Sequence, residues 1–153
     1  MKSGRECPIC AEGRPEEADG RLRVFEGQAI DADLSRDDAA RGYVTAFFRG
    51  RHVVEPTELS GDESSAFWAD LLRVMAAVES CYRPTKLNVL LLGNAVPHLH
   101  AHIVPAYADD PDAGQPPRFM MGWSGWKRLA DNVYLAEVDA LRAALADQAG
   151  VPR

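Results

Sequence analysis

Two segments of the chain repeat their hydrophobic residues with the spacing of an amphipathic helix. In the first, Ser60 and Glu63 match a capping box, and Pro84 ends the apolar pattern that follows. The apolar residues recur at helical intervals as Phe67, Leu71, Leu72, Met75 and Val78. The second segment is residues 133–149, with an apolar face of Tyr134, Val138, Leu141 and Leu145. The two patterns predict the main helices.

Short apolar and β-branched runs outside these helices predict strands. They cover residues 22–25, 43–48 and 87–92, and a further strand carries three of the four histidines. Stretches rich in Gly, Pro and acidic residues predict an irregular lead-in over residues 1–20 and loops over 31–41 and 106–132. Adjacent strands with helices inserted between them indicate an α+β fold with a mostly antiparallel sheet. The 153 residues fit a single domain.

The stretch VPHLHAHIVP places His98, His100 and His102 at every second position. In a strand, alternate side chains point to the same face, so the three imidazoles would share one face and the apolar residues between them the other. Buried imidazoles need hydrogen-bond partners, and three on one face make plain packing a poor explanation. A polar face exposed to water is the simplest alternative to a functional strand.

Two kinds of chemistry would use such a strand. As metal ligands, the outer histidines would be about 13 Å apart at Cα, which is far for two bonds of about 2.0 Å to one ion. As catalytic groups, a neutral imidazole attacks phosphorus and leaves again, while a second imidazole two residues on protonates the departing oxygen. The strand spacing favours the second possibility.

The segment HLHAHIV, residues 98–104, resembles the pattern of the histidine triad (HIT) family, His-φ-His-φ-His-φ-φ with φ apolar, at every position. The resemblance extends through CPIC, GYVTAFFRGRH and LNVLLLGN and covers most of residues 7–110. Within the family, the chain is similar to bacterial HIT proteins of the Fhit/Hint type. It implies a roughly five-stranded antiparallel sheet with two main helices, and a homodimer.

The resemblance also implies an activity, nucleotidyl transfer to water. His100 would attack the α-phosphorus of a nucleotide phosphoramidate or a dinucleoside polyphosphate, with its other nitrogen held as N–H by a backbone carbonyl near His98. His102 would lie near the leaving group. Water would then release a mononucleotide such as AMP, and an adenine nucleotide is the expected substrate. No metal would be required for the chemical step.

Residues outside the three histidines are expected to bind the substrate. Asn94 stands where the family directs polar residues at phosphate. Asp33 and Asp37 are weak candidates for the ribose-binding acid, and each is otherwise expected to be a solvated loop charge. Trp123 and Trp126 follow the histidine strand and would form either a lid or dimer contact, or a cover for the core.

Cys7 and Cys10 form a C-x-x-C pair, which alone is half of a zinc site or a redox pair. Its place in an irregular segment disfavours a thioredoxin-like role. The resemblance implies a structural zinc held by Cys7, Cys10, His52 and His98, since several HIT proteins combine such a pair with these two histidines. This site would tie the N-terminal segment to the sheet.

The charge and hydrophobicity of the chain limit the kinds of partner that it is expected to bind. A net charge of −6 disfavours polymeric nucleic acid and membrane surfaces. The chain has no apolar run of about 18 residues and no signal-peptide core, which favours the cytoplasm. Three alternatives to the hydrolase stay open: nucleotidyl transfer to a second phosphate, a non-catalytic nucleotide-binding dimeric module, and a metal-dependent hydrolase that uses the three histidines as ligands.

Overall fold

The structure, a computed structural model, describes residues 4, 6–13, 15–18, 20–37, 40–122 and 126–148. Within these residues the chain forms the following elements in order: α1 (Pro8–Glu12), β1 (Glu17–Ala18), β2 (Arg21–Glu26), β3 (Ile30–Leu34), β4 (Val44–Phe48), the 3-10 helix η1 (Pro56–Glu58), α2 (Gly61–Tyr82), β5 (Lys86–Leu90), β6 (His100–Ala106), the 3-10 helix η2 (Arg118–Met121) and α3 (Asp131–Gln148). The expected α+β class is confirmed.

The strands form one sheet in the order β1-β2-β3-β4-β6-β5, and every neighbouring pair is antiparallel. The prediction of about five strands misses the two-residue strand β1, which pairs with the start of β2. Strand β6 enters between β4 and β5, because the chain passes through α2 and β5 before it returns to the sheet. The strand with the histidines is therefore an inner strand, held on both sides.

Both predicted helices are present. The Ser60 hydroxyl accepts a hydrogen bond from the Glu63 amide, and the Glu63 carboxylate accepts one from the Ser60 amide, which confirms the capping box. Helix α2 ends at Tyr82, before Pro84. The assignment of Leu72 to the buried face is wrong, since its side chain is 48% exposed. Leu72 follows Leu71 by one residue, which turns it about 100° away from the core.

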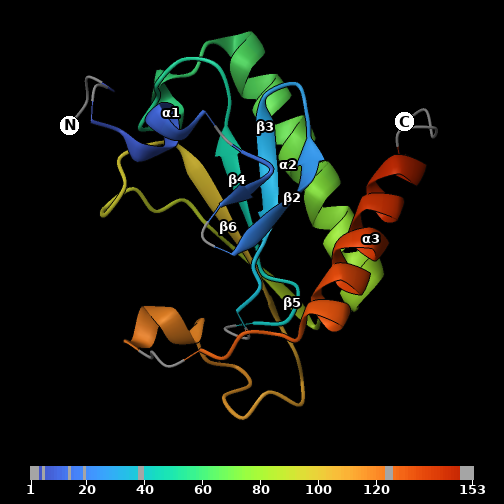
Figure 1. The fold of residues 1–153 in the computed structure, drawn as a ribbon. Helices are drawn as coiled ribbons and strands as arrows, with labels where there is room; N and C mark the ends of the chain where they lie inside the picture. Colours follow the sequence, from blue (N-terminus) through green and yellow to red (C-terminus); the bar gives the residue numbers. More distant parts are fainter. Residues whose placement is uncertain are drawn as a thin grey trace.

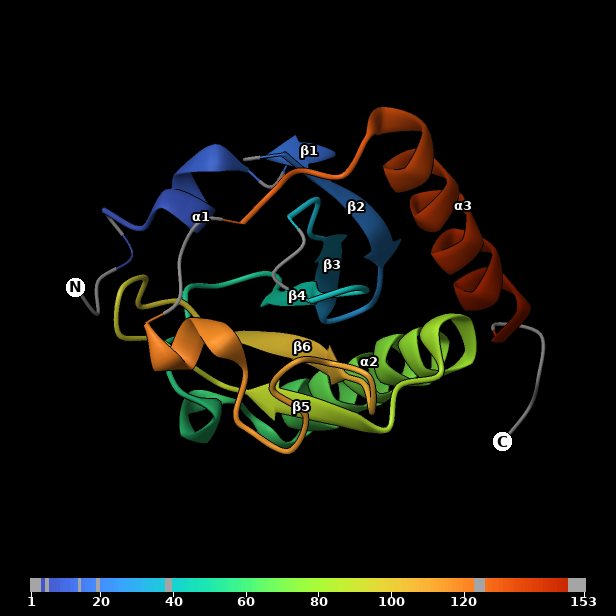
Figure 2. The ribbon, with the colours of Figure 1, turned by 90° about the horizontal axis from the view of Figure 1, so that it is seen from below.

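Helices α2 and α3 lie together on one side of the sheet, whereas α1 and the segment containing η2 lie toward the other side (Figures 1 and 2). The core lies between the sheet and these two helices, and the expected face of α3 is buried in it: Tyr134, Val138, Leu141 and Leu145. Among the described residues, no helix combines the length and apolar character that a membrane span requires. The opposite face of the sheet carries the polar side chains.

Two segments expected to be irregular are ordered. Residues 1–20 include α1, which Pro8 begins and Gly13 ends in a left-handed conformation, and they also include β1. Residues 31–41 begin with most of β3, in which Asp31 and Asp33 are buried rather than solvated. Arginines compensate the buried carboxylate of Asp31, since its oxygens lie 3.3 Å from Arg49 Nε and 3.7 Å from Arg23 Nη1. The acidic residues Asp31 and Asp33 therefore made strand β3 look like a loop in the sequence.

The other predicted loop and helix boundaries differ from the structure by only a few residues. The loop expected over residues 106–132 contains η2, and its last residues belong to α3, which begins at Asp131. The predicted helix over 133–149 is confirmed up to Gln148, and residue 149 lies outside the described residues.

Candidate functional site: the three histidines and the cysteine–histidine cluster

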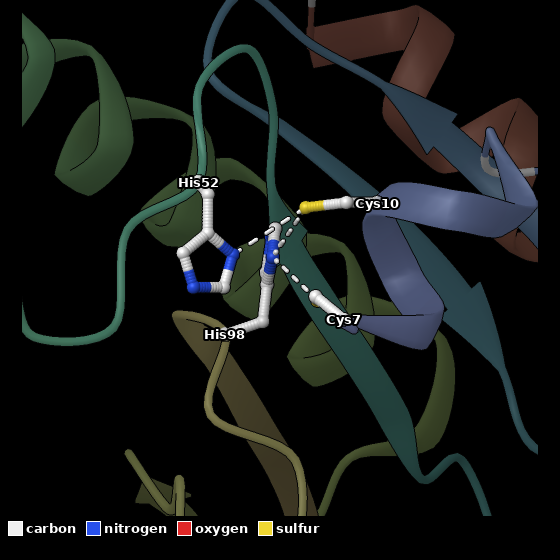
Figure 3. A group of neighbouring side chains, drawn as sticks. All are labelled: Cys7, Cys10, His52 and His98. Atoms are coloured by element: carbon white, nitrogen blue, oxygen red, sulfur yellow. Dashed lines mark hydrogen bonds between the residues drawn. The ribbon is translucent and has the colours of Figure 1, made fainter. Parts of the chain in front are cut away.

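The three histidines do not all lie in the strand. His100 and His102 belong to β6, pair across the sheet with Phe47 and Thr45, and occupy the polar face. His98 lies in a bend before β6, where its amide donates to the carbonyl of Val96 at 2.8 Å. The expectation of one shared strand face is therefore wrong for His98. Its side chain is 4% exposed and turns toward the N-terminal segment (Figure 3).

The ring of His100 is held in one tautomer. Its Nδ1 lies 2.6 Å from the main-chain carbonyl oxygen of His98, and because a carbonyl only accepts, Nδ1 carries the proton. The ring also stacks on Phe47, with centroids 5.9 Å apart and an interplanar angle of 27°. Burial lowers the pKa of His100, so the imidazole is neutral near pH 7. Its Nε2 is therefore an unprotonated nitrogen.

His102 has a partner that the sequence did not reveal. Its Nδ1 lies 2.6 Å from the hydroxyl of Tyr43, and its ring centroid is 4.8 Å from that of His100. Burial, followed by the neighbouring charges of His100 and Arg21, lowers the pKa of His102 to about 4. Tyr43 precedes β4, on the face that Thr45 and Phe47 continue. That alternation is the one signal in the sequence that could have indicated this contact.

A cavity of about 530 Å³ opens over His100 and His102. Its wall includes Asn94 and Asp37, two of the candidate substrate-binding residues, and it excludes Asp33. Arg21 is the one cationic side chain among the described residues that line it. Trp126 also lines the cavity, which fits a cover over a ligand, whereas Trp123 lies outside the described residues. The volume lies within the range of small-molecule sites.

Four side chains from three segments converge beside the sheet (Figure 3). Cys7 and Cys10 come from the α1 segment, His52 from the loop after β4, and His98 from the bend before β6. The ligand atom that each residue offers lies within 4.8 Å of the other three. Both histidines present Nδ1 to the sulfurs, at sulfur–nitrogen separations of 3.4–3.5 Å. The structure thus brings together the four residues of the predicted metal site.

This cluster fits a tetrahedral metal ion. Zinc bonds of about 2.3 Å to sulfur and about 2.0–2.1 Å to nitrogen place neighbouring S and N ligands about 3.5 Å apart, as the cluster has them. His98 also has an outer partner, because its Nε2–H donates to the carbonyl of Phe48 at 2.9 Å. That bond leaves the lone pair of Nδ1 directed at the cysteines and holds the ring in place. His98 is therefore committed to this cluster and not to the cavity.

Comparisons with known proteins identify a related family and a shared fold. Residues 35–109 match the HIT domain family model. A histidine triad protein from Bradyrhizobium japonicum has 21% sequence identity and a TM-score of 0.73, over 82% of this chain and 91% of that one. One from Marinobacter aquaeolei VT8 has 21% identity and a TM-score of 0.73, over 84% and 90%.

A zinc-bound histidine triad family protein from Mycobacterium smegmatis has 22% identity and a TM-score of 0.65, over 96% of this chain and 98% of that one. No curated protein matches the chain in a sequence search. The family-model match and the shared fold, together with the His98, His100 and His102 pattern, show that the chain belongs to the histidine triad (HIT) family.

Proposed function

We propose that the protein is a nucleotide hydrolase that works through a covalent nucleotidyl-His100 intermediate. The observation that carries the proposal is the 2.6 Å contact between His100 Nδ1 and the carbonyl oxygen of His98. This contact leaves Nε2 with a lone pair in a ring that lines the 530 Å³ cavity. A buried neutral imidazole of this kind is a good nucleophile toward phosphorus and a good leaving group.

The reaction would proceed in two displacements. In the first, Nε2 of His100 attacks the α-phosphorus and the bond from phosphorus to the leaving group breaks. The negative charge of the bound phosphate would favour the protonated form of His102, which then gives its Nε2 proton to the leaving atom and becomes neutral, while the Tyr43 hydroxyl oxygen accepts from Nδ1–H and holds the ring. In the second displacement, water attacks the phosphorus, returns a proton to His102 and frees His100. The product is a mononucleotide such as AMP.

Three other side chains in the cavity wall would bind the nucleotide. We assign Asn94 to a phosphoryl oxygen, as its amide can donate there. Arg21 adds positive potential beside the phosphate. Asp37, rather than Asp33, is placed to accept from the ribose hydroxyls, because Asp33 lies outside this cavity. Nucleotide phosphoramidates and dinucleoside polyphosphates are the two substrate classes, with adenine as the first base to test.

We further propose that Cys7, Cys10, His52 and His98 hold a structural zinc ion. The sulfur–nitrogen separations of 3.4–3.5 Å support this assignment. The zinc would supply a crosslink between the α1 segment and the two loops that flank the sheet. The use of His98 in this cluster disfavours a hydrolase that binds its metal with all three histidines. We propose that the chemical step uses only the side chains of the cavity.

Residues 1–153 are proposed to form one HIT domain that works as a homodimer in the cytoplasm. The N-terminal segment and α3 both pack on the sheet that contains the matched residues 35–109, which supports a single domain (Figure 1). The edge strand β5 offers one side for pairing with a second copy. Light scattering coupled to gel filtration tests the dimer, and a monomer mass at micromolar concentration would contradict it.

Adenosine 5′-phosphoramidate and a diadenosine polyphosphate provide the test of the hydrolase. We expect the wild type to release AMP, with a nucleotidyl adduct on His100 visible by mass spectrometry after an alkaline quench, which preserves the phosphorus–nitrogen bond. His100→Gln should form no adduct, and imidazole added to His100→Gly should restore part of the turnover. A wild type that binds AMP but hydrolyses neither compound would refute the proposal in favour of a binding module.

A further inference from the structure

A second cavity, of about 620 Å³, adjoins the one over the histidines. It lies under residues 107–118, between the middle of β5, the end of β6 and the start of α3. Ser35 and Asp37 line both cavities, so the two volumes meet at this rim. The second cavity contains none of the three histidines and has no part in the steps assigned above.

Strand β6 leads from one cavity into the other. His100, His102, Val104 and Ala106 are alternate residues and share one face of the strand. The first two line the cavity of the histidines and the last two line the second cavity, whose nearest residue is about 7 Å beyond His102 along the strand. Along β6, the proposed nucleophile His100 therefore comes first, His102 beside the leaving group comes next, and the second cavity follows.

The segment that leads into β4, on the other side of β6, repeats this order. Tyr43, which contacts His102, lines the first cavity, and the two residues before it, Arg41 and Gly42, line the second. Because β4 and β6 are antiparallel, going backward along β4 toward Arg41 leads in the same spatial direction as going forward along β6 from His102 to Ala106. A group that departs beside His102 therefore has the second cavity next to it.

The charges of the second cavity show what it can accept. Arg118 pairs with Asp112 at 2.8 Å, and Arg41 approaches Glu137 at 3.8 Å. Within the described part of the chain, no cation lies in ion-pair range of the two further acids of the lining, Asp37 and Asp110. The Asp110 carboxylate accepts a hydrogen bond from the amide of Tyr107, at 2.8 Å. The cavity therefore carries an excess of negative charge, with one of the two acids on the shared rim.

The remaining wall is largely apolar. Pro111, Pro116, Pro117, Leu129 and Val133 contribute to it. The ring of Tyr107 also lines it, and the hydroxyl of this residue donates to the carbonyl of Arg41 at 2.8 Å. An alkyl chain or a ring suits these surfaces, and a positive charge suits Asp110.

We propose that the second cavity is the leaving-group site and takes the amine half of a nucleotide phosphoramidate whose organic group is neutral or cationic. The inference rests on the proposed function. A dinucleoside polyphosphate would instead bring further phosphate charges against Asp110, which costs binding energy. In the first displacement the bond from His100 Nε2 to phosphorus forms, the phosphorus–nitrogen bond of the substrate breaks, and the nitrogen takes its proton from His102. The free amine then lies in the second cavity.

Two AMP phosphoramidates of matched length test the charge selectivity. One carries an N-(6-aminohexyl) group, which is cationic, and the other an N-(5-carboxypentyl) group, which is anionic. We expect kcat/KM of the wild type to be roughly five- to tenfold higher for the cationic compound, the size of one charge interaction near a surface. Asp110→Asn should reduce this ratio and Asp110→Lys should invert it, while Asp109→Asn, whose side chain lies outside the lining, is the matched control.

Equal kcat/KM for the two compounds, or an equal change of the ratio in Asp110→Asn and Asp109→Asn, would overturn the inference. Adenosine 5′-phosphoramidate separates this failure from that of the proposed function, because its leaving group is ammonia and does not reach the second cavity. If the wild type hydrolyses it but shows no charge selectivity, only the second-cavity assignment fails. If the wild type hydrolyses none of the three compounds and no diadenosine polyphosphate, the hydrolase proposal fails too.

Discussion

The carbonyl oxygen of His98 lies 2.6 Å from Nδ1 of His100, while the side chain of the same His98 faces the cysteine pair. His98 thus connects the cysteine–histidine cluster, which its side chain contacts, to the cavity, where its backbone carbonyl contacts His100. The ring of His98 is fixed further by the 2.9 Å bond to the carbonyl of Phe48. We expect changes in the cysteine–histidine cluster to reach the ring of His100 by this route.

Replacement of Cys7 by Ser should therefore remove bound zinc, lower the melting temperature and reduce activity. The loss of a structural metal removes binding energy that is also folding energy, and a displaced His98 no longer orients His100. We expect kcat to fall about 10- to 100-fold, the usual cost of a lost outer partner. Metal analysis, thermal unfolding and AMP release measure the three effects.

Cys81→Ser is the matched control, because Cys81 contacts the carbonyl of Ala140 and lies outside the cluster. It should keep zinc and activity. Exchange of zinc for cadmium should also preserve turnover, since thiolates bind cadmium and no step passes through the metal. Equal zinc content in Cys7→Ser and the wild type would contradict the site.

Tyr43→Phe removes the hydroxyl that lies 2.6 Å from Nδ1 of His102. A hydrogen bond of this kind contributes about 0.5–1.5 kcal/mol, so we expect kcat to fall roughly three- to tenfold with little change in KM. The effect should be larger for a poor leaving group, which depends more on the proton from His102. Steady-state kinetics with two leaving groups of different basicity measure it.

Tyr82→Phe provides the comparison for this variant. It also loses a tyrosine hydroxyl, one that donates to Glu137, but Tyr82 does not line the cavity of the histidines. If the two variants lowered kcat equally, Tyr43 would have no special relation to His102.

The stability of the protein should fall on acidification partly because of His102. Its pKa is lowered from 6.5 to about 4 by burial and nearby charges, so between these values the unfolded chain binds a proton that the folded protein does not. The contribution of His102 is complete above pH 6.5 and is lost as the pH falls through about 4. Denaturant unfolding at pH 7 and pH 4.5 should show a smaller loss for His102→Gln than for the wild type.

Zinc content is measured at both pH values, because acid also protonates the cysteine ligands. The comparison is made between proteins with equal metal content. An identical pH dependence for the two proteins would show that His102 titrates alike in the folded and unfolded states.

Asp70 contributes to stability at a distance from the site. Its carboxylate is buried and accepts hydrogen bonds from the amides of Ala29 at 2.7 Å and Ile30 at 3.4 Å, at the turn between β2 and β3. Asp70→Ala leaves both amides without this acceptor and should cost about 2–4 kcal/mol of unfolding free energy. Asp62→Ala, in the exposed first turn of α2, should cost less than about 1 kcal/mol. Urea unfolding of the three proteins tests the difference.

The sequence determined the features that lie within one segment of the chain. The capping box of Ser60, the buried face of α3 and the spacing of His100 and His102 depend on local periodicity, and each is present in the structure. The C-x-x-C pair and His52 could be assigned to one cluster only because the family pattern connects them. Local spacing does not reveal that Cys7 meets a histidine 91 residues away.

Only the tertiary structure decided where charged and hydrogen-bonding side chains lie. Strand β3 looked like a loop because the arginines that compensate Asp31 come from β2 and from the segment after β4. The partnership of Tyr43 with His102 spans 59 residues and requires β6 to enter beside β4. The second cavity likewise forms only where residues 107–118 fold back over the sheet. Burial and orientation of polar groups depend on such distant contacts, whereas apolar periodicity depends on the backbone geometry of each element alone.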